Sequence, residues 1–157
     1  GITVQSKSGH AFIKDVMREH NAVYGGEMSA HHYFRDFAYC DSGMIPWLLA
    51  ISVLSETQQS LSSLVEDMIT KFPCSGEINF KVADTQATIQ KLFDHFADQN
   101  PEIDRTDGVS LDFGTWRFNV RASNTEPLLR LNIESRLDQN PKPMQAYVNE
   151  LTQLIQS

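Results

Sequence analysis

Apolar side chains occupy every second position in two segments near the end of the chain, residues 116–121 and 128–134. Strict alternation of apolar and polar residues indicates a strand that buries one face. The alternating apolar residues are Trp116, Phe118, Val120, Leu129, Leu131 and Ile133. We therefore predict two strands, joined by the polar segment 121–127.

Further strands and helices are predicted around these two strands, and together they form a domain in the second half of the chain. Residues 77–82 alternate as a strand, and Asp84 is suited to cap a helix whose apolar side carries Ile89, Leu92, Phe93 and Phe96. Asp107-Gly108 is a strong hairpin signal, and Pro141 and Pro143 precede a last amphipathic helix. The order strand, helix, three strands and helix predicts a small antiparallel sheet with two helices on one face.

The first half has the pattern of an α/β unit. We predict short strands at residues 2–5 and 22–24, a helix at 12–19, and strand or connection at 33–39. The nearly all-apolar run 44–54 predicts a buried helix, and residues 61–72 carry an amphipathic stripe that we interpret as core or packing surface. Residues 72–76 break the pattern, so we place the domain boundary after residue 73.

Composition narrows the classes of function. The chain has 157 residues and a formal net charge of -7, which disfavours a nonspecific partner that is nucleic acid or an anionic membrane. There is neither a signal segment nor a run long enough to span a bilayer, so a soluble, cytoplasmic protein is expected. Cys40 and Cys74 lack metal-ligand spacing and receive no role.

The segment 121–127 contains an inventory of groups that can hold a phosphate. Arg121 offers a fork of donors, and Ser123, Asn124 and Thr125 add hydroxyl and amide groups beside backbone N–H groups. An ordinary polar hairpin loop would have a similar composition. The residues alone leave both interpretations open.

Residues 25–32 form a second chemically dense stretch. Gly25-Gly26 permits a tight turn, Glu27 can accept hydrogen bonds from sugar hydroxyls, and Ser29 can donate or accept them. His31 or His32 could exchange a proton near neutral pH. Each residue also has an ordinary structural interpretation, as a solvated acid, a turn residue or a half-buried strand histidine. His10 is open to the same two interpretations.

Taken together, the motifs GGEMSAHHYF and RASNTEP resemble the two substrate loops of the bacterial α-D-phosphohexomutases. The sequence between the two motifs is most similar to that of the phosphomannomutases. The resemblance runs over essentially the whole chain. It also covers Lys7-Ser8-Gly9-His10, Asp41, and the turn Arg105-Thr106-Asp107-Gly108, in the expected order.

This resemblance implies a fold and a set of roles. Residues 1–73 would be the latter part of the third, α/β domain of a four-domain enzyme, and 74–157 its complete fourth domain, a TBP-like α+β unit with a four-stranded antiparallel sheet and two helices. Glu27 and Ser29 would bind sugar hydroxyls, and His31 and His10 would face the cleft as catalytic residues. The phosphate that is not transferred would be held by Arg121, Ser123, Asn124 and Thr125.

The resemblance also implies a reaction, the interconversion of mannose 6-phosphate and mannose 1-phosphate, which feeds GDP-mannose biosynthesis. Such enzymes use a phosphoserine, Mg²⁺ and a hexose 1,6-bisphosphate intermediate. Neither the serine loop nor the aspartate-rich metal loop occurs in this sequence, so we expect a C-terminal piece of a longer enzyme, inactive alone and without its own metal site. Its partners would be the hexose phosphate and the missing N-terminal domains. The alternatives are a stand-alone, non-catalytic phosphosugar-binding module and a purely structural or partner-binding domain.

Overall fold

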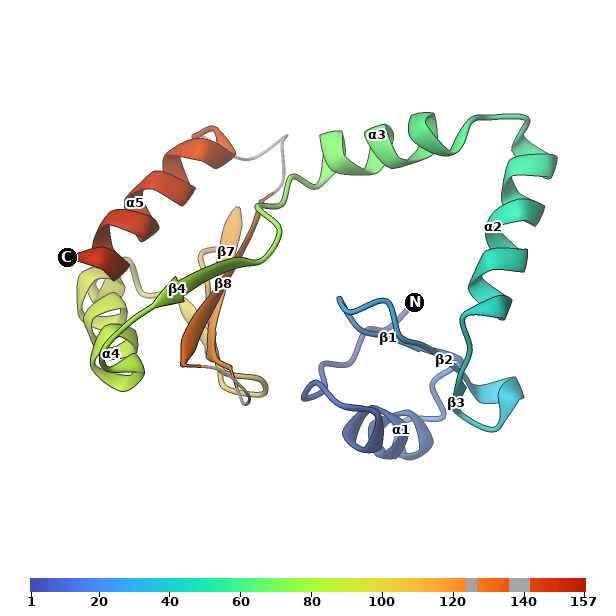
Figure 1. Cartoon of the computed structure of the whole chain (residues 1–157), viewed down its shortest axis with the longest axis horizontal. Coiled ribbons are helices and arrows are strands. Elements are labelled where there is room, and N and C mark those ends of the chain that lie inside the picture. The colour runs from blue at the N-terminus through green and yellow to red at the C-terminus, as the bar shows by residue number, and fades with distance from the viewer. Residues whose placement is uncertain (124–126, 136–141) are drawn as a thin grey trace. The chain divides into compact units, whose positions relative to one another are not determined.

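The computed structural model of the chain describes residues 1–123, 127–135 and 142–157 (Figure 1). These residues form two compact units, Gly1–Leu64 and Val65–Ser157. The division falls inside helix α3 (Leu61–Lys71). The domain boundary that we expect after residue 73 stays a prediction.

The first unit is built on a small antiparallel sheet with the strand order β1-β2-β3. Its elements are α1 (His10–Glu19), β1 (Tyr24–Gly26), β2 (His32–Phe34), the short 3-10 helix η1 (Arg35–Phe37), β3 (Cys40–Asp41) and α2 (Met44–Thr57). The core consists of Ile13 and Met17 from α1 and Tyr33 from β2.

Gly25 allows α1 to approach this sheet closely. A Cβ atom at Gly25 would lie 2.7 Å from Met17 Sδ and 3.0 Å from Ile13 Cγ2, closer than ordinary side-chain contacts. A side chain at position 25 would therefore force Met17 and Ile13 to shift, so the glycine favours close helix–strand packing. This packing fixes the base of the hairpin that connects β1 to β2.

Two expectations for the first half need correction. Residues 2–5 form no strand, and the strand expected at 22–24 instead begins at Tyr24. The run 2–5 lies outside the β1-β2-β3 sheet, and without a paired edge an apolar alternation alone does not make a strand.

Helix α2 was expected to be buried, and the structure shows that it is not. No residue of α2 is buried, and Trp47, Leu48 and Leu49 are each more than half exposed. The apolar stripe of α3 is exposed as well, with Met68 at 59% and Ile69 at 57%. The sequence did predict both helices, but burial of an apolar face also requires a second surface, which the described residues do not supply.

The second unit contains a five-stranded sheet in the order β4-β8-β7-β6-β5. Every neighbouring pair is antiparallel. The elements are β4 (Ile78–Lys81), α4 (Thr85–Phe96), η2 (Ala97–Gln99), β5 (Glu102–Asp104), β6 (Val109–Asp112), β7 (Trp116–Ala122), β8 (Leu128–Ser135) and α5 (Met144–Gln156).

The expected α+β architecture is confirmed, with one strand more than predicted. The additional strand, β5, has only three residues, and its single apolar side chain, Ile103, is 48% exposed at the sheet edge. The hairpin signal at Asp107-Gly108 indicated a partner segment at Ile103, but a segment this short has too little alternation to be counted as a strand. The Asp107-Gly108 turn leads from β5 to β6 as a hairpin, with Gly108 at a φ of 71°.

Helices α4 and α5 cover one face of this sheet (Figure 1). Asp84 caps α4 by accepting hydrogen bonds from the backbone N–H groups of Gln86 and Ala87. The core includes stacked aromatic rings, with the Trp116 and Tyr147 centroids 4.1 Å apart. The opposite face carries the polar positions of β7 and β8, and so the alternation in the sequence also determines where charged groups gather.

Candidate functional site

The β1–β2 hairpin carries three of the expected site residues. The Glu27 N–H donates to the His31 carbonyl at 3.0 Å, and the Ala30 N–H donates to the Glu27 carbonyl at 3.0 Å. The sequence predicted a tight turn at Gly25-Gly26, but the turn lies at residues 27–30. Ala30 takes the positive φ of 64°, while the glycines stay in the strand for packing.

The carboxylate of Glu27 is fixed in place by a buried tyrosine. The Tyr33 hydroxyl donates to Glu27 Oε1 at 2.6 Å, and Tyr33 is only 1% exposed. Ser29 Oγ lies 3.5 Å from the other oxygen, Oε2. Burial, together with the hydrogen bond to Glu27, raises the pKa of the Tyr33 hydroxyl, which keeps it protonated as a donor. Glu27 is thus a positioned acceptor with oxygen lone pairs left for a ligand.

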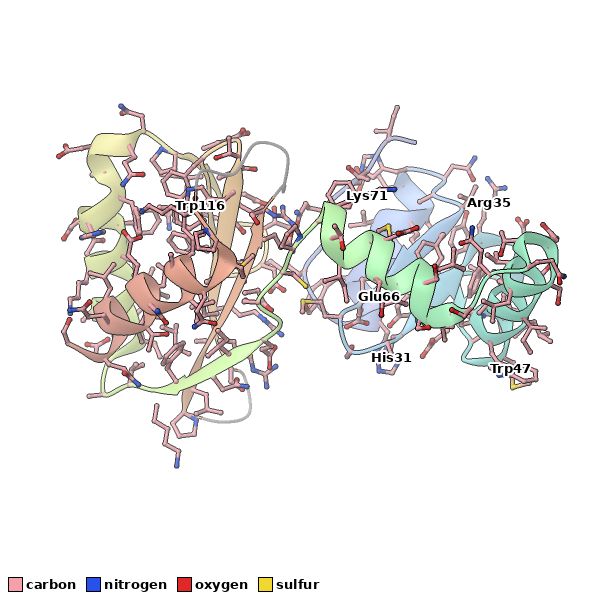
Figure 2. All side chains as sticks on the ribbon, turned by 90° about the horizontal axis from the view of Figure 1, so that it is seen from above. His31, Arg35, Trp47, Glu66, Lys71 and Trp116 are labelled. Carbon is pink, nitrogen blue, oxygen red and sulfur yellow. The ribbon has the colours of Figure 1, made fainter. Side chains whose placement is uncertain are left out.

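His31 stands at the end of the same hairpin and contacts Asp41 of β3. His31 Nδ1 lies 2.6 Å from Asp41 Oδ2, and the backbone N–H of His32 donates to Asp41 Oδ1 at 3.0 Å. The hydrogen bond and charge of Asp41 raise the pKa of His31, and the same hydrogen bond lowers the pKa of Asp41. The His31 side chain is 53% exposed and projects outward from the sheet (Figure 2).

The two other candidate histidines lie in different surroundings. His32 is partly buried, and its Nδ1 is 2.7 Å from the Tyr24 hydroxyl. His10 is the exposed first residue of α1, and none of the hydrogen bonds of the Glu27–Asp41 network includes it. Of the three, His31 is the one that the hairpin brings together with Glu27 and Ser29.

Arg121 ends the polar face of β7, as its place in the alternation predicted. It is directly opposite Arg130 of β8 in the strand register, and Glu77 Oε2 lies between the two guanidinium groups, 3.7 Å from Arg121 and 3.6 Å from Arg130. Two cations and one carboxylate leave one net positive charge. A local anion site on an acidic chain needs such an excess of positive charge.

The loop that follows Arg121 is described only at its two ends. The Ser123 N–H donates to the Leu128 carbonyl at 2.8 Å, which closes the β7–β8 hairpin. Asn124 and Thr125, which were expected to help hold the phosphate, lie outside the described residues.

Comparison with known proteins matches both halves of the chain to domains of one family. The phosphoglucomutase/phosphomannomutase alpha/beta/alpha domain III model matches residues 1–72, and the C-terminal domain model of the same family matches residues 77–146. The chain belongs to the phosphoglucomutase/phosphomannomutase family. The Glu27 hairpin falls within the domain III match, and Arg121 falls within the C-terminal domain match.

Several relatives share this part of the family. The chain is 66% identical over 138 residues to a protein of Xanthomonas campestris named "Phosphohexose mutases", with 88% of this chain and 31% of that protein covered. It is 56% identical over its whole length to a phosphomannomutase of Salmonella montevideo, of which it covers 34%. A Vibrio cholerae phosphomannomutase is 56% identical over 99% of this chain and 33% of its own length.

A solved structure agrees in fold with the chain. It is that of a phosphoglucomutase/phosphomannomutase family protein from Burkholderia thailandensis, which is 22% identical with a TM-score of 0.67 and is matched over 96% of this chain and 31% of its own. The chain thus spans about a third of the length of its matched family members.

The residues that the structure describes contain no candidate metal site. Within residues 1–123, 127–135 and 142–157, no three His, Cys, Asp or Glu side chains lie together in a way that could hold an ion. Over the same residues, no helix is both long and apolar enough to cross a membrane.

Sequence reasoning missed Tyr33, Arg130 and Glu77 as members of these sites and gave Asp41 no role. Tyr33 and Asp41 are cross-strand partners of the β2–β3 pair, so strand register, and not a motif, brings Asp41 to the hairpin. The alternation in β8 could have placed Arg130 on the polar face, but only the register puts it opposite Arg121.

Proposed function

We propose that this chain supplies the sugar and phosphate binding of a phosphomannomutase, an isomerase that interconverts mannose 6-phosphate and mannose 1-phosphate. The observation that carries the proposal is the Glu27 carboxylate, held at 2.6 Å by Tyr33 on the hairpin that also bears Ser29 and His31. Its support comes from relatives named phosphomannomutase that are 56% identical over 99% and 100% of the chain.

Glu27 and Ser29 are the proposed ligands of the sugar ring. A carboxylate can accept hydrogen bonds from two or more hydroxyl groups, and a serine hydroxyl can donate or accept a hydrogen bond as the ring requires. Because Tyr33 fixes one carboxylate oxygen, Glu27 does not have to be ordered when a sugar binds, which reduces the entropic cost of recognition.

Arg121 is the proposed anchor of the phosphate that is not transferred, with Ser123, Asn124 and Thr125 as additional donors. A guanidinium can form two parallel hydrogen bonds to one phosphate. In phosphoryl transfer the protein contributes mainly position and charge stabilisation. The sugar would bind in two orientations, one for each end that reacts. In either orientation, a clamp on the phosphate that is not transferred would position the other end of the sugar for reaction.

His31 is the proposed proton carrier at the sugar hydroxyl, and His10 is the second proposed histidine. A raised pKa makes the imidazolium form of His31 a larger fraction near neutral pH, so the ring can donate as well as accept a proton. The Asp41 contact gives this role a structural basis in the hairpin. For His10 the sole support is its place in the resemblance.

The transfer step itself is assigned to the rest of the polypeptide. We propose that the phosphoserine, the Mg²⁺ and the turnover of a hexose 1,6-bisphosphate belong there, since the described residues offer no group that could hold the metal. The partners are the hexose phosphate and the rest of the polypeptide. At a net charge of -7, neither nucleic acid nor a membrane is proposed as a partner.

The proposal is tested by assaying the whole protein that contains this chain with mannose 1-phosphate, glucose 1-phosphate and glucosamine 1-phosphate. We expect conversion of mannose 1-phosphate to the 6-phosphate, and a loss of activity in Glu27→Ala and Ser29→Ala. A protein that binds mannose 1-phosphate without converting it would favour the binding-module alternative. Activity confined to glucosamine 1-phosphate would refute the proposed substrate.

A further inference from the structure

The geometry points to Asp41 as the positioning residue of His31: its carboxylate fixes the imidazole in the tautomer that carries the proton on Nδ1 and leaves Nε2 for the ligand. The inference rests on the proposed function for its catalytic consequence. The contact itself can be tested without it.

Asp41 is held in place by the backbone before it contacts the imidazole. Its Oδ1 accepts from the His32 N–H at 3.0 Å, and its backbone is paired with Tyr33 in the β2–β3 register. The second oxygen, Oδ2, is then directed at His31 Nδ1 at 2.6 Å. One carboxylate therefore connects the strand to the imidazole, and His31 cannot turn without losing a charge-assisted hydrogen bond.

A carboxylate can only accept hydrogen bonds when ionised, so the Nδ1 atom that faces it must carry a proton. In the neutral ring this makes Nε2 the unprotonated nitrogen. With the side chain 53% exposed and Nδ1 engaged, Nε2 is the atom that can take a proton from a ligand hydroxyl or return one.

The surrounding groups favour the same state. The titratable groups around the imidazole are Asp41, whose charge and hydrogen bond raise the pKa of His31, and Glu27, whose charge acts in the same direction. His32 contacts Asp41 through its backbone, while its own ring nitrogen Nδ1 lies against the Tyr24 hydroxyl. His31 is therefore the imidazole that Asp41 orients.

Asp41→Asn gives a sharp test because the amide has only one way to fit. The backbone N–H of His32 can only donate, so the amide oxygen must face it and the NH₂ group must face His31. The NH₂ group can only donate, and Nδ1 must then accept. The substitution reverses the tautomer of His31 while keeping the size and the shape of the side chain.

The experiment uses the whole protein with histidines labelled with ¹⁵N, and the His31 ring signals are assigned by their loss in His31→Gln. In the wild type, the neutral ring should show a protonated Nδ1 and an unprotonated Nε2. In Asp41→Asn the two signals should exchange character, and kcat should fall by roughly tenfold or more with little change in KM. Asp36→Asn is the matched control, because this aspartate is exposed and pairs with Arg35. It should change neither readout.

A neutral wild-type ring protonated at Nε2 overturns the inference, and that measurement needs no variant to fold. An unchanged tautomer in folded Asp41→Asn overturns it as well. Reversal of the tautomer together with full activity in His31→Gln supports Asp41 as the positioning residue and refutes the proton-carrier role of His31. The failures of the two ideas are therefore distinguishable.

Discussion

Replacing Arg121 by alanine removes the proposed phosphate anchor and leaves the fold nearly intact. The Arg121 side chain is 23% exposed and sits on the polar face of β7. Its ion partner, Glu77, lies 3.7 Å away, at the long end of ion-pair distances. The variant therefore tests binding with little cost in stability.

Two opposing terms set the change in stability. A partly exposed ion pair contributes about 0–1 kcal/mol, and its loss is offset by relief of the repulsion between Arg121 and Arg130, which face each other directly. We therefore expect the free energy of unfolding to change by less than about 1 kcal/mol. A hydrogen bond to a charged group contributes about 1.5–3 kcal/mol, so kcat/KM should fall by a factor of about 10 to 150.

Steady-state kinetics with mannose 1-phosphate, together with thermal unfolding, measure the two quantities. Arg117→Ala is the matched control, because Arg117 lies on the same face of the same strand, four residues from Arg121, and is paired with Glu134 at 2.8 Å. Its kcat/KM should stay within about twofold of the wild-type value. A folded Arg121→Ala with wild-type kinetics would refute the role of Arg121 as a phosphate clamp. Equal losses of kcat/KM in Arg121→Ala and Arg117→Ala would show a general effect of positive charge and not a specific clamp.

Three other predictions follow from single contacts. Tyr33→Phe should lower kcat/KM several-fold and cost about 1 kcal/mol in unfolding, because Glu27 loses its fixed donor; unchanged kinetics would show that Glu27 needs no positioning. Asp84→Ala should destabilise the protein by about 1 kcal/mol in denaturant unfolding without affecting kinetics, since it caps α4 through two backbone N–H groups. The His31–Asp41 pair should stabilise the fold most between the ordinary pKa values of 3.8 for aspartate and 6.5 for histidine. Because the pKa of His31 is raised, its contribution is lost as the pH rises through that raised pKa. Because the pKa of Asp41 is lowered, its contribution is lost as the pH falls through that lowered pKa. The difference in the free energy of unfolding between wild type and Asp41→Asn, measured from about pH 2 to 9, should narrow at both ends; a difference independent of pH would contradict an ionic pair.

The second unit was predictable because its strands bury one face only. Alternation located β7 and β8, the proline and cap signals located the helices, and Arg121 followed as a residue of the polar face. The hairpin signal indicated a segment at Ile103, but β5 was left out of the predicted four-stranded sheet because a three-residue edge strand has almost no pattern. Burial of α2 was wrongly predicted because apolar composition indicates what a helix can bury, and burial itself depends on a packing surface from elsewhere.

The candidate site was only partly visible in the sequence for a related reason. Glu27, Ser29 and His31 are close in sequence, so one motif contains them all. Tyr33 is six residues from Glu27 and Asp41 is ten from His31, and both reach the hairpin through strand pairing and burial. Residues that touch a ligand can be found by motif, whereas the residues that hold them require the register of the sheet.

The central claim is that Glu27 is a sugar ligand and Arg121 a phosphate ligand, and calorimetric titration of the whole protein tests it most directly. Mannose 1-phosphate and inorganic phosphate are titrated into the wild type, Glu27→Ala and Arg121→Ala. We predict that both variants bind mannose 1-phosphate about tenfold or more weakly, and that inorganic phosphate loses affinity only in Arg121→Ala. Wild-type affinity for mannose 1-phosphate in either folded variant would contradict the account.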